Sequence, residues 1–133
     1  MIGFDIVDAN DFYNMNEEKQ KKYINNVKEE IKRSSNKILK KMENIVKRNV
    51  SYFQSDFYVH DLHMIKNNPG HFIWMTRETG TDFIPLESVD EILMSWYNAV
   101  KHTNEQFYFC DGKTLKKLTF DEMEKIVNKY KKD

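Results

Sequence analysis

The chain has 133 residues, with 21 Lys and Arg against 21 Asp and Glu, a hydrophobic fraction of 40% and an aromatic fraction of 14%. This length fits a single domain, 1–133, and the composition excludes wholesale disorder. Cys110 is the only cysteine, which excludes an intramolecular disulfide and favours a reducing, cytoplasmic setting.

The net charge of zero hides a polarised distribution. Residues 16–50 carry eleven Lys and Arg against five Glu, whereas residues 51–112 carry three against nine acidic residues. This separation of basic and acidic segments affects which partners the chain can bind and does not determine its fold. The chain also lacks both an apolar run of about 20 residues, which a membrane span requires, and a signal-peptide pattern at its start, so we expect no membrane partner.

The N-terminal half is predicted to be helical after a short lead-in. Residues 1–13 show no sustained period and are expected to be irregular. Ile24, Ile31, Ile38 and Ile45 then recur at intervals of seven, which predicts a basic helix over about 16–49. Ser34–Asn36 consists of weak helix formers and could divide this segment into two helices. The Ile spacing continues in phase across it, so we favour one helix. Its length of about 50 Å exceeds one domain, so part of it should project or meet another chain.

The C-terminal half alternates helices and hairpins. We expect helices at about 55–67, 89–102 and 120–131, and β-hairpins at about 71–86 and 106–118, the second turning at Asp111-Gly112. Tight turns imply antiparallel pairing. The predicted fold is therefore α+β, in the order α-α-β-β-α-β-β-α, with a mainly antiparallel four-stranded sheet and helices on one face.

One line of polar residues in the second predicted helix has residue types and spacing that suit a metal site. Asp56, His60 and His63 follow i, i+4, i+7 spacing, and His71 lies just beyond the Pro69-Gly70 break. Imidazole and carboxylate together suit a divalent metal such as zinc or manganese. A metal-dependent, phosphodiesterase-like hydrolase would use them as ligands, with a general base drawn from Asp61 and Glu78. The alternative is a solvated polar stripe without a cofactor.

Two other stretches suggest binding surfaces. Trp74 and Arg77, near the tip of the first hairpin, are residue types enriched in interfaces, although Trp74 is equally suited to a core. Cations of the long helix, among them Lys28, Lys32, Arg33, Lys40 and Lys41, could neutralise phosphates or dock on an acidic protein.

Phosphate-binding glycine loops, nucleophile elbows and dinucleotide fingerprints are missing from the sequence, so we lean away from an enzyme. The leading hypothesis is a small intracellular, non-enzymatic binding or regulatory module that uses the basic helix to bind a protein partner or a second copy. The abundance of Lys, Asn and Ile suggests an AT-rich genome, hence a bacterial or mobile-element accessory protein. The metal-dependent hydrolase and a non-specific nucleic-acid-binding protein are the alternatives.

Overall fold

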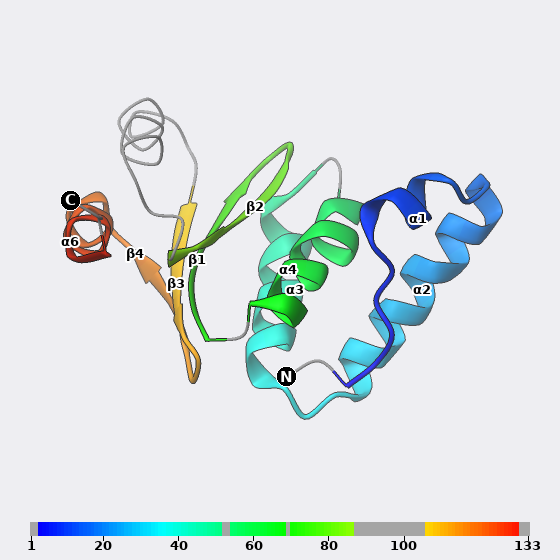
Figure 1. Cartoon of the computed structure of the whole chain (residues 1–133), viewed down its shortest axis with the longest axis horizontal. Helices are drawn as coiled ribbons and strands as arrows, with labels where there is room; N and C mark the ends of the chain where they lie inside the picture. Colours follow the sequence, from blue (N-terminus) through cyan, green and yellow to red (C-terminus); the bar gives the residue numbers. More distant parts are fainter. Residues whose placement is uncertain (1–2, 52–53, 69, 87–105, 131–133) are drawn as a thin grey trace.

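A computed structural model of the chain describes residues 3–51, 54–68, 70–86 and 106–130 (Figure 1). The elements in order are α1 (Ala9–Tyr13), α2 (Glu17–Arg33), α3 (Lys37–Asn49), η1 (Phe57–Asp61), α4 (Leu62–Asn67), β1 (His71–Arg77), β2 (Gly80–Pro85), β3 (Gln106–Asp111), β4 (Leu115–Leu118) and α6 (Phe120–Tyr130). The predicted α+β fold with a four-stranded antiparallel sheet is confirmed. The helix expected at 89–102 lies outside the described residues.

The sheet has the strand order β2-β1-β3-β4, and every neighbouring pair is antiparallel. Both predicted hairpins are present, and they join through β1 and β3 at the centre. The second hairpin turns at Gly112, whose φ of +89° favours a residue without a side chain. The carboxylate of Asp111 accepts hydrogen bonds from the backbone N–H groups of Lys113 and Thr114, both at 2.8 Å, and so fixes the turn.

Helices cover both faces of the sheet, so the prediction of one covered face was wrong. Alternate residues of β1 point to opposite sides: Phe72 and Trp74 pack with α2, α3, η1 and α4, whereas Ile73 and Met75 pack with α6. In Figure 1 the sheet stands between α6 and the remaining helices. The apolar character of both sides of β1 therefore has a packing explanation.

The single helix predicted over 16–49 is in fact two helices. The side chain of Asn36 accepts hydrogen bonds from the N–H groups of Ile38 and Leu39, at 3.0 and 3.1 Å, and thereby caps α3. Ser34 accepts from the N–H of Asn36 at 3.0 Å. These local bonds replace helical ones, so the chain turns between α2 and α3 and forms two shorter helices, of about 26 and 20 Å.

The lead-in is not wholly irregular, because α1 forms within it. Asp8 caps this helix by accepting from the N–H of Asp11 at 2.8 Å. Phe12 is buried against the ring of Tyr23, which ties α1 to α2. Within the ranges given above, no helix is long and apolar enough to cross a membrane.

The helix predicted over 55–67 contains one π-helical turn, η1. Its signature is the hydrogen bond from the N–H of Leu62 to the carbonyl of Phe57, five residues earlier. A π turn holds an extra residue, so side chains five apart come close to one face. Asp56 and Asp61 are such a pair, and β2 packs against this turn.

Candidate functional site

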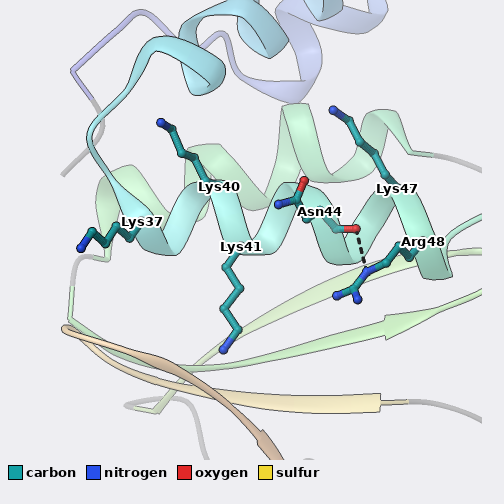
Figure 2. A pocket seen from close by; sticks show the side chains of 6 residues that line it. All are labelled: Lys37, Lys40, Lys41, Asn44, Lys47 and Arg48. Carbon is teal, nitrogen blue, oxygen red and sulfur yellow. Dashed lines mark hydrogen bonds between the residues drawn. The ribbon is translucent and has the colours of Figure 1, made fainter.

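The exposed face of α3 carries a dense set of cations around a shallow hollow of about 600 Å³. The lining residues are Lys37, Lys40, Lys41, Asn44, Lys47 and Arg48 (Figure 2). Their spacing of three, four and seven residues places them on one side of the helix, while Leu39, Met42, Ile45 and Val46 are buried on the other. The amphipathic pattern that packs α3 on the core therefore also sorts its cations onto one surface, which we call the α3 basic face.

The α3 basic face has two flanks. Figure 2 shows Lys40 and Lys47 extending to one side of the helix and Lys41 and Arg48 to the other, with the uncharged Asn44 between them. Within each flank the two cations are seven residues apart, which is about 10 Å along the axis.

Among the described residues, few neighbouring groups neutralise these charges. Lys41 donates to the carbonyl oxygen of Leu115 at 2.6 Å, and Arg48 donates from Nε to the carbonyl of Asn44 at 3.4 Å, so both partners are uncharged. Lys47 pairs with the largely buried carboxylate of Glu43 at 3.2 Å. With five cations and one carboxylate, α3 has a formal charge of +4.

The cations predicted on the first half of the basic segment are placed differently. Lys28 lies over the ring of Tyr58, with Nζ 5.4 Å from the ring centroid, and Arg33 pairs with Glu30 at 3.3 Å. Lys32 is exposed. Because α2 carries four carboxylates beside six cations, its formal charge is only +2, and the basic character of the segment is concentrated on α3.

The predicted metal ligands do not gather at one point. His60 and His63 line a hollow of about 270 Å³ together with Asp8 of the α1 cap. The Nε2 atom of His60 lies 3.4 Å from the hydroxyl of Tyr13, and the Nε2 atom of His63 lies 3.0 Å from the amide nitrogen of Asn67.

The other two predicted ligands, Asp56 and His71, do not line this hollow, although burial raises the pKa of Asp56 and the nearby His60 lowers it. His71 belongs to the α6 side of β1, where its ring contacts Phe109, and Asp56 faces β2. Within the part of the chain that the structure describes, no three His, Cys, Asp or Glu side chains are placed to hold a metal ion together.

The proposed bases, Asp61 and Glu78, have contrasting environments. Glu78 is exposed in the first hairpin turn, where its carbonyl accepts from the N–H of Ser51 at 2.9 Å. Asp61 is buried and accepts a 2.6 Å hydrogen bond from the indole nitrogen of Trp74.

Asp61 belongs to a cluster of carboxyl groups that sequence reasoning missed. The pKa of Asp61 is raised to about 7, chiefly by burial and to a smaller extent by the carboxylates of Asp82 and Asp56, although hydrogen bonds from Thr81 and Trp74 lower it. Burial also raises the pKa of Asp82, although its 2.9 Å pair with Arg77 opposes the effect. The only sequence signal was an aspartate close to the apolar residues Val59 and Leu62.

The surface predicted at the tip of the first hairpin is not formed by Trp74. Its side chain is fully buried and packs on Phe57 and Tyr108, with ring centroids 5.9 and 5.5 Å apart. Arg77, 40% exposed at its side chain, is engaged by Asp82. Cys110 is also buried, and burial raises the pKa of its thiol, which makes it a poor nucleophile.

Comparisons with protein-family models, with curated proteins and with solved structures find no match to this chain.

Proposed function

We propose that this chain is a non-enzymatic binding module that binds nucleic acid through the phosphate backbone, using the α3 basic face. The observation that carries the proposal is the set of five cations on one exposed side of a 13-residue helix, lining a hollow to which no carboxylate of the described residues contributes. Clustered Lys and Arg on one helical face are the electrostatic footprint of phosphate binding.

The arrangement favours nucleic acid over a second copy of the chain. Self-association through charge would need the acidic segment 51–112 to present its carboxylates outward. Among its described acidic residues, Asp61 is buried, and burial raises the pKa values of the partly buried Asp56 and Asp82. Glu78 and Asp111 are the exposed ones, and they stand at the turns of two different hairpins, so the described part of the segment offers no acidic patch as dense as the α3 basic face.

The first test is fluorescence anisotropy with labelled 20-nucleotide DNA and RNA, single- and double-stranded, at several salt concentrations. About four phosphate contacts predict a slope of log affinity against log salt near −4, hence roughly a hundredfold loss between 50 and 200 mM salt. Absence of binding at 50 mM, or binding that does not respond to salt, would overturn the proposal. Binding to an acidic protein, with no affinity for nucleic acid, would replace it with a protein partner.

A matched pair of triple variants locates the surface. Lys37→Gln, Lys40→Gln and Arg48→Gln remove three charges from α3, whereas Lys19→Gln, Lys22→Gln and Lys32→Gln remove three exposed charges from α2. We expect the α3 variant to lower the salt slope by about 3, because each lost phosphate contact removes about 0.9. The α2 variant should retain most of the slope. Equal losses in the two variants would show that binding is not centred on α3.

A further inference from the structure

The two-flanked geometry of α3 points to a particular form of nucleic acid, and we infer that the ligand is double-stranded DNA of B-form, with α3 in its major groove. The inference rests on the proposed function. A helix with its side chains is about 10–12 Å across, and the B-DNA major groove is about 12 Å wide, so a helix enters with one backbone on either side. The α3 basic face matches this requirement because its cations form two rows instead of one.

Each flank would contact one strand. Lys40 and Lys47 extend to one side, and Lys41 and Arg48 extend to the other (Figure 2). The separation of about 10 Å within each row corresponds to about three nucleotide steps of 3.4 Å along a strand. Asn44 occupies the midline between the rows, where the groove floor would lie, and its uncharged amide can both donate to and accept from base edges.

The sheet extends one flank. Lys117 of β4 pairs in register with Tyr108, which packs in the core on the α3 side of the sheet, so Lys117 shares that side. Arg48 lies close enough to Tyr108 to lower the pKa of its hydroxyl, against the larger effect of burial, which raises it. Lys41 reaches the same hairpin at Leu115. The second flank thus consists of Lys41, Arg48 and Lys117. By contrast, Lys116 points to the opposite side and pairs with Glu122 at 2.9 Å.

The surface is poorly suited to single strands or to double-stranded RNA. Single-strand binders stack bases on exposed aromatic rings, and among the described residues the exposed large hydrophobic side chain is Tyr13, which belongs to α1 and not to the α3 basic face. The major groove of A-form RNA is too narrow for side chains on a helix to read.

The decisive experiment compares a 20-base-pair DNA duplex with one of its single strands and with the RNA duplex of the same sequence, at 100 mM salt. We expect the DNA duplex to bind at least tenfold more tightly than either competitor. Equal or tighter binding of the single strand or the RNA duplex would overturn the inference but leave phosphate binding intact. Failure to bind all three would instead overturn the proposed function itself.

Flank variants test whether two strands are contacted. Lys40→Gln with Lys47→Gln, and separately Lys41→Gln with Arg48→Gln, should each weaken duplex binding about tenfold, with circular dichroism checking that both variants are folded at the assay temperature. A loss confined to one pair would show contact with a single backbone and reject the groove geometry. The neighbours on β4 give a further matched pair: Lys117→Gln should weaken binding several-fold and Lys116→Gln less than twofold, and the reverse order would contradict the inference.

Discussion

The indole nitrogen of Trp74 donates a 2.6 Å hydrogen bond to the carboxylate of Asp61, and the two side chains are 0% and 2% exposed. This bond connects the centre of the sheet with the π turn of η1. It also places an ionisable group where solvent cannot reach it, beside two further carboxyl groups, those of Asp56 and Asp82. The free energy of unfolding therefore depends on whether Asp61 is charged or neutral.

The first prediction concerns pH. The pKa of Asp61 is about 7 in the folded protein, against 3.8 ordinarily, so the folded state binds more protons than the unfolded state between these values. Its free energy of unfolding should consequently fall as the pH rises from about 4 through 7, by on the order of 3 kcal/mol from this group. Urea denaturation at pH 5, 6, 7 and 8 measures the slope.

Two variants isolate the contribution of Asp61 to this slope. Asp61→Asn keeps an acceptor for Trp74 and should flatten the slope while stabilising the protein at pH 8. Asp111→Asn is the control, because hydrogen bonds from Thr114 and Lys113 hold the pKa of the Asp111 carboxyl below its usual range. It therefore stays ionised between pH 5 and 8 and should leave the slope unchanged. A slope that persists in Asp61→Asn would contradict the assignment.

The second prediction removes the donor of the same bond. Trp74→Phe leaves the Asp61 carboxylate buried with one partner fewer and creates a cavity, so we expect destabilisation by about 3 kcal/mol or more at pH 8. At pH 5 the loss should be smaller, since a protonated carboxyl is less costly to bury. Chemical denaturation at both pH values checks the difference. An equal loss at both would mean that the cost arises from packing alone.

The features that could be predicted from the sequence are those set by interactions between residues close together in the chain. Turn chemistry is local, so Asp111-Gly112 identified the second hairpin. The signal for the break between α2 and α3, at Ser34–Asn36, is also local. The seven-residue spacing of Ile31 and Ile38 nevertheless favoured one continuous helix. That spacing persists because both helices pack on the same core.

The carboxyl cluster could not be predicted from the sequence. A helical wheel at 100° per residue places Asp56 and Asp61 about 140° apart, and only the extra residue of the π turn brings them together. Asp82 follows Thr81, the β2 residue that contacts Asp61, so its charge acts on Asp61 although its register partner Met75 lies on the α6 side of the sheet. The α3 basic face could not be predicted either, because the sequence spreads cations over all of 16–49. Only the break between α2 and α3 shows that those of α3 form a surface of their own.

A third prediction tests that break. Asn36→Ala removes the side chain that caps two N–H groups of α3, and it should destabilise the protein by about 1 kcal/mol. Asn36→Asp retains an acceptor at the cap, so it should keep most of the stability. Thermal unfolding followed by circular dichroism provides the measurement. Alanine as stable as asparagine would show that the cap is not what sets the start of α3.

A fourth prediction concerns the second hairpin. Gly112 has a φ of +89°, which L residues rarely adopt, although a side chain there would meet only Cα of Gly70 at 3.9 Å. Gly112→Ala should therefore cost about 1 kcal/mol through backbone strain and not through a clash. Gly112→Asn should cost less, because asparagine tolerates positive φ better. Equal costs for alanine and asparagine would argue against the backbone explanation.

The last prediction is a gain of binding. Glu43 is 6% exposed and its carboxylate pairs with Lys47, which is the one ion pair found for the α3 cations in the described part of the chain. Glu43→Gln preserves size and hydrogen bonding but removes the negative charge, raising the formal charge of α3 from +4 to +5. If α3 binds phosphates, DNA affinity at 50 mM salt should rise several-fold and the salt slope should steepen by up to 0.9. Glu30→Gln, which frees Arg33 on α2, is the matched control and should have little effect. Unchanged affinity in Glu43→Gln would show that Lys47 does not contribute its charge to the binding surface.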